Sequence, residues 1–302
     1  MKILITGANG LLGSNLCLMY SKENEVIATN RTKPNISNCL NYKIDITNKE
    51  DMKIIEELRP DMIIHCAALV NVDYCEEHPK EAHKINFIGS KNIAESAKKT
   101  NSYLVHISTD AVFDGKKGYY NEDDPTNPLN VYGQTKLEAE KIIQKTNSNH
   151  VIIRTNIYGW NKQNKLSLAE WMLDKLEKNQ ELQAFKDIFF SPMLVNNLGE
   201  AILELYDLKY KGILHLAGSE GCSKLNFAKK IAKIFNIGNP TIIEINSDDL
   251  KLKAKRPKNM VLNVNKAKSI LKKTEILNVE GGLVRFKQLR DSGYLDTIKK
   301  NE

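Results

Sequence analysis

The chain has 302 residues, of which 41% are hydrophobic and 27% charged, and its formal net charge is +7. This length and balance are typical of a globular protein with one large α/β domain or two smaller ones. The lysines are scattered, without an arginine-rich arm or alternating basic and aromatic residues, so we expect no nucleic-acid partner. A mild positive field favours an anionic ligand, such as a phosphorylated cofactor or a sugar nucleotide.

Cysteine usage and hydropathy indicate the cellular compartment of the protein. The five cysteines form no CxxC pair and show no metal-ligand spacing, so they are typical of reduced thiols and we expect no metal site. No apolar run is long enough to cross a bilayer, and Met1 leads directly into a predicted strand, which leaves no room for a signal peptide. The sequence therefore predicts a cytoplasmic protein without a membrane partner.

The first predicted element is a strand over Lys2–Thr6, followed by the turn GANG and by leucines at helical spacing. In a dinucleotide-binding turn, Gly7 would allow the tight bend, Gly10 would let the backbone approach a pyrophosphate, and Gly13 would let helix pack on strand. The helix N-terminus would donate hydrogen bonds to the phosphates. The spacing is GxxGxxG rather than GxGxxG, and a purely structural turn is the alternative.

The second predicted strand, residues 25–29, ends in Asn-Arg-Thr-Lys. NAD-preferring enzymes usually place an acidic residue there for the ribose 2′-hydroxyl. Here Arg31 and Lys33 stand without an acid, which favours a 2′-phosphate and hence NADPH. Alternatively, both cations are ordinary loop charges.

Two further strands are predicted over residues 41–44 and 61–65. Asp45 follows the first of them, where it could accept a hydrogen bond from an adenine amino group or cap the helix expected near Lys49. The small residues Cys66, Ala67 and Ala68 follow the second, at a point where a backbone passes close to a ligand. A long helix is predicted over residues 79–100, and Asn86 in its apolar stripe is expected to tie it to a neighbouring loop.

The next predicted strand, residues 103–108, ends at Thr109, and the carboxyl end of a parallel strand points at the ligand crevice. The helix predicted over Val131–Thr146 carries Tyr132 and Lys136, whose spacing puts them on one face. An ammonium one turn away would lower the pKa of the phenol, normally about 10, and suit it for proton transfer to a substrate oxygen. Thr109 could hydrogen-bond the same oxygen. Alternatively, Tyr132 and Lys136 are a chance YxxxK pair on a solvated helix face and have no chemical role.

The alternation of strands and helices predicts an α/β fold with a doubly wound, Rossmann-type parallel sheet. We expect this domain to cover residues 1–155, joined again by about 190–210, and a smaller C-terminal substrate-binding lobe to cover residues 156–302. The later elements are predicted as helices over residues 168–178, 198–208, 224–235 and 265–272, the last one in the chain, and as strands over residues 151–155, 212–216 and 240–245.

Several stretches together resemble the extended short-chain dehydrogenase/reductases, and within them most closely the dTDP-4-dehydrorhamnose reductase family. The resemblance covers nearly the whole chain and is strongest over residues 1–160. It is carried by TGANGLLG, HCAALVNVDYCEEHP, INFIGSKNIAESA, HISTDAVFDG and DDPTNPLNVYGQTKLEAE.

The resemblance implies that Thr109, Tyr132 and Lys136 form a catalytic trio. A hydride from NADPH, or alternatively NADH, would reach the C4 ketone of a nucleotide-linked deoxysugar, with Tyr132 protonating the resulting alkoxide and Lys136 holding the nicotinamide ribose. The implied cofactor contacts are Gly7, Asn9, Gly10, Leu11, Leu12, Gly13, Asn30, Arg31, Asp45, Ile46, Cys66, Ala67, Ala68, Tyr132 and Lys136, and the implied substrate contacts are Val70, Ser108, Thr109, Asp110, Asn156 and Arg256. A homodimer is one option for the assembly.

The chain departs from the family's pattern at informative positions. Ala111 follows Asp110, where a dehydratase needs a glutamate. The stretch IIRTNIYG lacks the family's tryptophan near the sugar, and Trp160 could take its place. Asn15 stands where some relatives carry an acid linked to metal-dependent pairing. Two alternatives remain: an epimerase or dehydratase of the same superfamily, and a non-catalytic, NADP-binding regulatory subunit.

Overall fold

The computed structural model describes residues 1–163, 165–250 and 253–300, and its centre is a seven-stranded sheet in which every pairing is parallel. The strand order is β11-β6-β5-β4-β1-β2-β3. Central strands such as β4 are buried along their whole length, because helices cover both faces of the sheet. The strands are β1 (Lys2–Thr6), β2 (Glu25–Asn30), β3 (Leu40–Lys43), β4 (Met62–His65), β5 (Tyr103–Thr109), β6 (His150–Thr155) and β11 (Gly212–His215).

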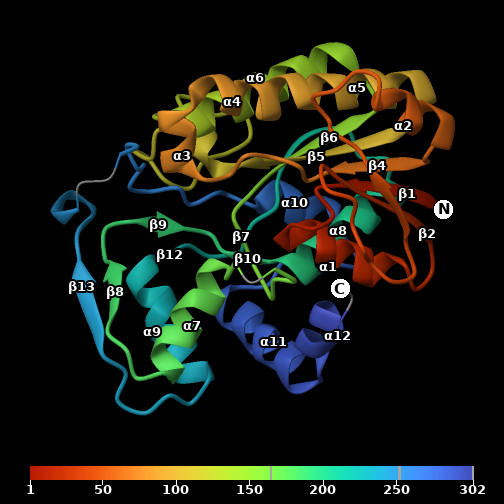
Figure 1. Ribbon diagram of the computed structural model, residues 1–302. Helices are drawn as coiled ribbons and strands as arrows, with labels where there is room; N and C mark the ends of the chain where they lie inside the picture. The colour runs from red at the N-terminus through yellow and green to blue at the C-terminus, as the bar shows by residue number, and fades with distance from the viewer. Residues whose placement is uncertain (164, 251–252, 301–302) are drawn as a thin grey trace.

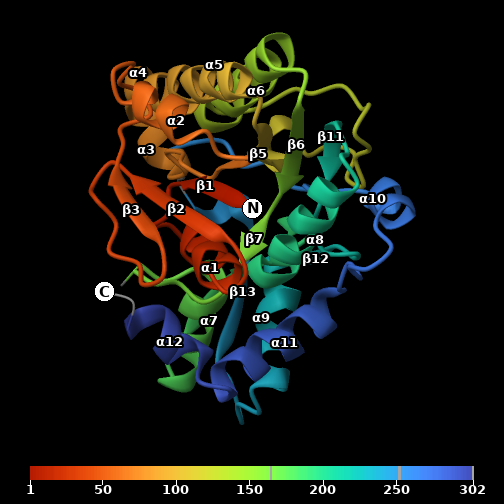
Figure 2. The same cartoon turned by 90° about the vertical axis from the view of Figure 1, so that its right-hand side faces the viewer.

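The helices form one layer on each side of the sheet (Figures 1 and 2), which confirms the predicted doubly wound fold. One layer holds α2 (Met52–Leu58), α5 (Gly89–Thr100) and α6 (Val131–Thr146), and the other holds α1 (Leu11–Tyr20) and α8 (Val195–Asp207). The α1–α8 contact is close because α8 carries a glycine: a Cβ on Gly199 would lie 2.9 Å from Met19 Cε. The hydroxyl of Tyr20 donates to the Gly199 carbonyl at 2.6 Å.

The long helix predicted over residues 79–100 is interrupted. It consists of α4 (Pro79–His83), a π-helical turn η1 (Lys84–Ile88) and α5, and a short helix α3 (Val72–Glu77) precedes it. Asn86 lies in the π turn and ties it to the loop after β4, accepting from Leu69 N at 2.8 Å and donating to Leu69 O at 3.1 Å. The expected role of Asn86 is therefore confirmed. The π-helical turn lies where the helix is bonded to that loop.

A second apolar core lies below the sheet in Figure 1, between α7 (Leu168–Glu177), α9 (Lys224–Ile234) and α11 (Val279–Asp291). Short strand pairs border it: β7 (Ile157–Tyr158) with β10 (Met193–Leu194), β9 (Phe189–Phe190) with β12 (Cys222–Ser223), and β8 (Leu182–Phe185) with β13 (Ile242–Ile245).

The helix predicted to be the last, at residues 265–272, is α10 (Asn265–Ile270), and that prediction of order is wrong, because α11 and α12 (Tyr294–Lys300) follow it. Two consecutive glycines near the start of α11 lower its helix propensity, so the sequence pattern did not predict this helix. Packing explains one of them, since a Cβ on Gly282 would lie 2.5 Å from the Tyr158 hydroxyl.

The chain returns to the large sheet after the first part of the lobe. α8 packs on α1, and β11 pairs with β6. We therefore keep, as a proposal, a Rossmann domain of residues 1–155 rejoined by about 190–210, with the other later residues forming the lobe. None of the helices in the described ranges is long and apolar enough to cross a membrane.

Candidate active site

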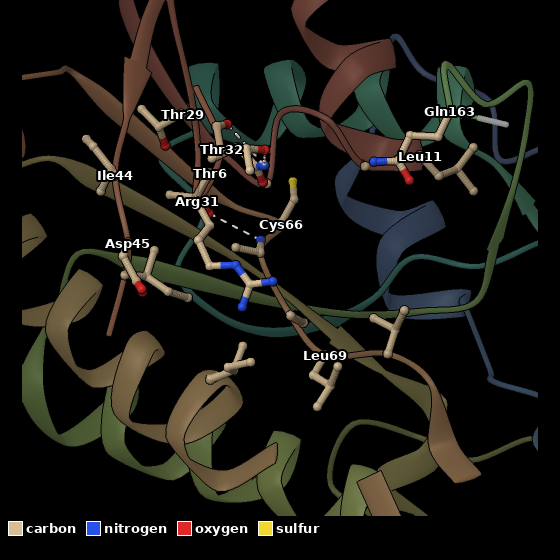
Figure 3. Close-up of a pocket in the computed structure, with 18 of the residues that line it drawn as sticks. Thr6, Leu11, Thr29, Arg31, Thr32, Ile44, Asp45, Cys66, Leu69 and Gln163 are labelled. Atoms are coloured by element: carbon tan, nitrogen blue, oxygen red, sulfur yellow. Dashed lines mark hydrogen bonds between the residues drawn. The ribbon is translucent and has the colours of Figure 1, made fainter. Parts of the chain in front are cut away.

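A cleft of about 760 Å³ opens at the carboxyl ends of β1, β2 and β4 (Figure 3). Its floor includes Gly7 and Gly10, and helix α1 begins directly after Gly10. No side chain of the described residues caps that helix, so its first N–H groups remain available to an anionic ligand.

The glycine turn is shaped by close backbone approaches. Gly7 has φ +67°, and a Cβ there would lie 2.8 Å from Ala67 N. A Cβ on Gly13 would lie 2.3 Å from Gly7 O, so this position lets α1 pack against the turn. Such a cradle fits the pyrophosphate of a dinucleotide.

The opposite end of the cleft is lined by Asn30, Arg31 and Thr32, and Arg31 extends its guanidinium into the cleft (Figure 3). Asp45 also lines it, and its Oδ1 accepts from Thr47 N at 2.9 Å and from Thr47 Oγ1 at 2.8 Å. The alternative in which Asp45 caps a helix is wrong, because α2 begins only at Met52 and Asp45 instead holds its own turn. Its contact with an adenine group stays a prediction.

Most of the expected cofactor residues meet in this cleft, and five do not line it. The lining includes Gly7, Gly10, Leu11, Asn30, Arg31, Asp45, Ile46, Cys66, Ala67 and Ala68, together with Val70, which was expected at the substrate. Asn9, Leu12, Gly13, Tyr132 and Lys136 are outside the lining. Leu12 packs in the core because its side chain faces the sheet.

The structure adds a segment that sequence reasoning missed. Asn161, Gln163, Lys165, Leu166 and Ser167 line the cleft from the first part of the lobe. Ser167 and Glu170 form a capping box at the start of α7, and the Ser-x-x-Glu spacing in the sequence was the available signal.

Thr109 and Tyr132 meet beside this cleft. Thr109 ends β5, and Tyr132 is the second residue of α6. The first turn of α6 packs directly on the segment after Thr109, because a Cβ on Gly133 would lie 2.2 Å from Ala111 O. The Thr109 hydroxyl lies close enough to the Tyr132 phenol to lower the pKa of that phenol, against the larger effect of burial.

The expected lowering of the Tyr132 pKa by Lys136 is wrong for this structure. Burial raises the pKa of Tyr132 to about 12, and the nearby Thr109 hydroxyl offsets only part of the effect. Lys136 Nζ donates to Ile107 O at 2.7 Å and lies 3.2 Å from His106 Nε2, so its charge is directed at the end of β5 rather than at the phenol. Burial also lowers the pKa of Lys136 to about 8, while the carboxylate of Glu140 opposes that shift.

Two of the expected substrate residues join Thr109 in one hydrogen-bonded unit. Asp110 is buried, and its Oδ2 accepts from Asn156 Nδ2 at 2.7 Å. Thr109 Oγ1 donates to Asp110 Oδ1 at 3.2 Å and accepts from Ala111 N at 3.1 Å. Burial raises the pKa of the Asp110 carboxyl.

Ser108 is not part of that unit. Its hydroxyl donates to Glu140, and Glu140 pairs with Arg154 at 2.7 Å, both side chains being at most 3% exposed. The structure thus assigns Ser108 to a buried polar cluster that joins β5, α6 and β6, because successive side chains of a strand point to opposite faces.

Arg256 lies apart from the trio. Its Nη2 donates to Asp73 Oδ2 at 2.7 Å, and its buried Nη1 has no hydrogen-bond partner within the described ranges. It lines a second cavity of about 780 Å³ between the 114–129 segment and the lobe, together with Lys116 and Lys258. Trp160 does not replace the missing tryptophan near the sugar: it is buried, stacks on Phe286 at 3.9 Å between ring centroids and donates to Phe286 O.

Lys224 is a residue of this site that sequence reasoning missed. It is the first residue of α9, and its Nζ lies 3.1 Å from the centroid of the Phe190 ring. Burial lowers the pKa of Lys224 to about 8, and the nearby carboxylate of Asp110 opposes that shift. A cation in the first turn of a helix opposes the helix dipole, and this local conflict was the signal that could have indicated a functional position.

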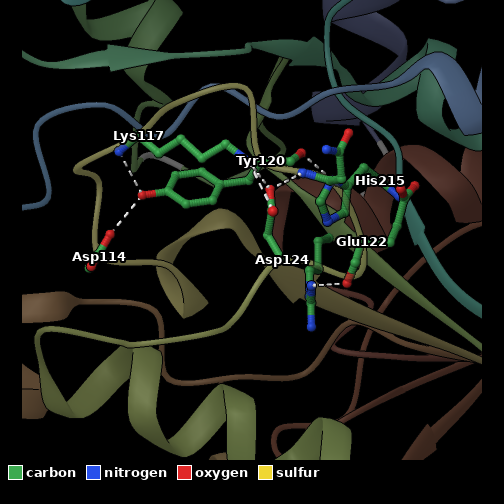
Figure 4. A network of polar contacts seen from close by, with 8 residues as sticks. Asp114, Lys117, Tyr120, Glu122, Asp124 and His215 are labelled. Atoms are coloured by element: carbon green, nitrogen blue, oxygen red, sulfur yellow. Dashed lines mark hydrogen bonds and ion pairs between the residues drawn. The ribbon is translucent and has the colours of Figure 1, made fainter.

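A polar network fixes the chain between Thr109 and α6 (Figure 4). Tyr120 donates to Asp114 at 2.7 Å, and Lys117 Nζ bonds Asp124 at 2.8 Å. The backbone N–H of His215 in β11 donates to Glu122 at 3.0 Å. These bonds anchor the 113–127 segment to the sheet, so α6 begins at a defined position relative to β5.

Known proteins were compared with the chain. The family model described as RmlD substrate binding domain matches residues 1–280. The chain is 33% identical to the spore coat polysaccharide biosynthesis protein SpsK of Bacillus subtilis, over 87% of this chain and 89% of that protein. It is 30% identical to the methionine adenosyltransferase 2 subunit beta of Bos taurus, over 89% of this chain and 82% of that protein. The crystal structure of dTDP-4-dehydrorhamnose reductase from Bacillus anthracis in complex with NADP superposes with a TM-score of 0.86 at 29% identity, covering 95% of this chain and 98% of that one.

Proposed function

Because the chain belongs to the RmlD substrate binding domain family, we propose that it is an NADPH-dependent reductase of the 4-keto group of a nucleotide-linked deoxysugar. The observation that carries the proposal is the convergence of Thr109 and Tyr132 at the carboxyl end of β5, beside the dinucleotide cleft. When bound, NADPH supplies the hydride.

The residues of the site supply the proton and the orientation. With a pKa of about 12, the Tyr132 phenol is protonated at neutral pH and can give its proton to an alkoxide. Thr109 hydrogen-bonds the same substrate oxygen, and the Asp110–Asn156 contact holds Thr109 in place. Lys136 presents an ammonium group one helical turn beyond Tyr132, where it can hold the nicotinamide ribose.

NADPH is the proposed cofactor because a cation, and no acid, occupies the end of β2. Arg31 lies in the cleft where an acidic residue would otherwise take the ribose 2′-hydroxyl. Its guanidinium can bond a 2′-phosphate in a bidentate manner. The NADP bound to the Bacillus anthracis reductase supports this choice.

The site favours reduction over elimination. Loss of water from a hexose needs one group to remove the C5 proton and another to protonate the departing hydroxyl. Asp110 is followed by Ala111, so a second carboxyl group is missing at that position. Ketone reduction needs only the hydride and one proton.

A second candidate function is that of a non-catalytic regulatory subunit, and the similarity to the methionine adenosyltransferase 2 subunit beta favours it. The two functions differ in one measurable property. A reductase consumes one NADPH for each 4-hydroxy product, whereas a regulatory subunit binds NADPH without consuming it.

The deciding experiment uses two reactions followed by NADPH absorbance and mass spectrometry. The first contains NADPH and a dTDP-linked 4-keto-6-deoxyhexose, and we expect stoichiometric NADPH oxidation and a 4-hydroxy product. The second contains dTDP-glucose with NAD⁺ or NADP⁺, and loss of one water there would contradict the reductase assignment. Tight NADPH binding without turnover in either reaction would favour the regulatory function.

A further inference from the structure

Two acceptors from consecutive residues of β5 hold the ammonium group of Lys136. Helix α6 packs on β5, and Lys136 is almost fully buried there. Its Nζ donates to Ile107 O at 2.7 Å and lies 3.2 Å from His106 Nε2. An ammonium group has three N–H donors, so these contacts use two of them and leave the third for another oxygen.

The contact determines where the His106 ring carries its proton. An ammonium group can only donate, so His106 Nε2 accepts from Lys136 and the ring proton is on Nδ1. The ring is neutral, because burial and the Lys136 charge hold the pKa of His106 well below its usual range. His106 is fully buried, and its Nδ1 has no hydrogen-bond partner within the described ranges. A buried donor without a partner is costly, which indicates that the contact with Lys136 has a use beyond packing.

A second buried histidine packs against the His106 ring. The ring centroids of His65 and His106 are 5.3 Å apart, and the ring planes differ by 37°. Ser90 Oγ donates its only proton to Asn86 O at 2.6 Å, so it must accept from His65 Nε2 at 3.0 Å. His65 Nδ1 then accepts from Thr6 Oγ1 at 2.8 Å. Because both ring nitrogens of His65 are bonded, this ring is fixed and limits the tilt of His106.

The same bonds extend to the wall of the cofactor cleft. His65 on β4 lies opposite His106 on β5 in the parallel register. Thr6 Oγ1 accepts from Ala67 N at 3.2 Å, and both Thr6 and Ala67 line the cleft. The two imidazoles therefore connect the cleft wall to the ammonium group of Lys136.

We propose that His106 is a positioning residue for Lys136: its Nε2 binds one N–H of the ammonium group, and the third N–H remains for an oxygen of the bound nicotinamide cofactor. Lysine has a flexible four-carbon stem, and a single acceptor would leave its head group free to rotate. The second acceptor, from the residue next to Ile107, removes that freedom. This inference rests on the proposed function, which gives Lys136 a cofactor oxygen to hold.

The groups around Lys136 determine the pH range in which the contact acts. Burial lowers the pKa of Lys136 to about 8, while Glu140 on the same helix and Cys66 after β4 oppose that shift. The neutral imidazole of His106 faces the ammonium group from β5, and that of His65 lies behind it on β4. NADPH affinity should therefore fall as the pH rises through about 8. Removal of the His106 acceptor should move that fall to lower pH, because an acceptor favours the charged form of Lys136.

The test measures the NADPH dissociation constant of the full chain by cofactor fluorescence, from neutral pH to about pH 9. Glutamine places its amide oxygen near the position of Nε2, whereas asparagine reaches only the position of Nδ1. His106→Gln should therefore bind NADPH within about twofold of the parent protein, and His106→Asn and His106→Leu should bind it about tenfold more weakly. In these two weaker variants the alkaline fall should also begin at lower pH. His150→Leu is the matched control, because it removes a buried imidazole at the amino end of β6, and it should leave NADPH binding unchanged.

Two further measurements separate positioning from a purely structural role. If His106 acts through Lys136, His106→Leu should weaken NADPH binding in the parent protein but not in a Lys136→Met protein. The nitrogen NMR spectrum of the His106 ring should show a neutral imidazole with its proton on Nδ1, and this measurement needs no cofactor.

Several results would overturn the proposal: equal losses in His106→Gln and His106→Leu, unchanged binding in every His106 variant, losses that add to that of Lys136→Met, or a ring proton on Nε2. The comparison of glutamine with asparagine stays valid if His106→Leu does not fold. NADPH binding without turnover by the parent protein would contradict the reductase function and leave the His106 comparison intact. A parent protein that binds no NADPH would also contradict the proposed function, and the NMR spectrum would then decide whether His106 accepts from Lys136.

Discussion

Replacing Glu140 by alanine should destabilise the protein strongly, because it leaves a buried guanidinium without its counter-ion. Arg154 Nη2 donates to Glu140 Oε2 at 2.7 Å and Arg154 Nε to Oε1 at 3.1 Å, and the two side chains are 3% and 1% exposed. After the substitution, the partners that Arg154 keeps among the described residues are the Glu122 carbonyl at 3.3 Å and the face of the Phe113 ring at 5.1 Å. Ser108 loses its acceptor as well.

Removing one partner of a buried ion pair typically costs about 3–5 kcal/mol. We therefore expect Glu140→Ala to lower the free energy of unfolding by about 3–5 kcal/mol in equilibrium urea titrations. Glu138→Ala is the matched control on the same helix, since its 3.7 Å contact with His83 is exposed and should contribute less than about 1 kcal/mol. The double variant Glu140→Leu, Arg154→Met removes both charges and should recover most of the loss.

A second substitution at Glu140 tests its effect on Lys136, in the helix that carries the proposed acid Tyr132. The Glu140 carboxylate raises the pKa of Lys136, whose value in the fold is about 8. In the isosteric Glu140→Gln protein that support is absent, so Lys136 should lose its proton at a lower pH and the alkaline limb of the activity profile should move toward neutrality. A loss below about 1 kcal/mol for Glu140→Ala, together with an unmoved alkaline limb for Glu140→Gln, would refute the proposed role of the buried pair.

Four further predictions concern single side chains. Tyr132→Phe should reduce turnover by about 10²–10⁴-fold with little change in NADPH affinity; turnover within a factor of two of the parent would exclude Tyr132 as the acid. Arg31→Ala should weaken NADPH binding by about tenfold and leave NADH binding unchanged in titrations, and equal losses for both would contradict the 2′-phosphate contact. Lys224→Met should raise KM more than it lowers kcat because Lys224 lies near Asp110, a proposed substrate contact, whereas Lys229→Met on the exposed face of α9 should change neither. Burial lowers the pKa of His65 to about 3, so this side chain stays neutral in the folded protein but takes a proton in the unfolded chain below about pH 6.5. The free energy of unfolding should therefore fall as the pH is lowered from 6.5 to 3, and His65→Asn should flatten that fall in unfolding titrations.

Local patterns predicted the features that depend on neighbours along the chain. The glycine turn after β1 and the helix over Val131–Thr146 were predictable because their signals, close glycines and the spacing of Tyr132 and Lys136, act within a few residues. The alternation of strand side chains could also have separated Ser108 from Thr109. Sequence spacing, in contrast, gave the wrong direction for the Tyr132 pKa, because the direction depends on where the Lys136 ammonium points.

Contacts between distant segments were not readable from the sequence. Nothing near Trp160 indicates that its ring stacks on Phe286, far away along the chain. Lys224 reaches the vicinity of Asp110 only because the lobe folds back over the end of β5. The local sequence does not give the partner of such a residue. The helix containing Gly281 and Gly282 was missed because the packing reason for Gly282 lies in Tyr158.

The contact between α1 and α8 has a consequence for biosynthesis. The apolar face of α1 is covered by α8, which begins only at Val195. At ordinary elongation rates of about 5–20 residues per second, the ribosome makes α8 about 10–35 s after α1, and the face of α1 stays uncovered during that time. During that interval the nascent chain presents α1 side chains such as Leu16 and Met19, which later surround Gly199. A ribosome-stalled chain ending near residue 190 should therefore engage a chaperone such as trigger factor, and release of the chain beyond α8 should end that association.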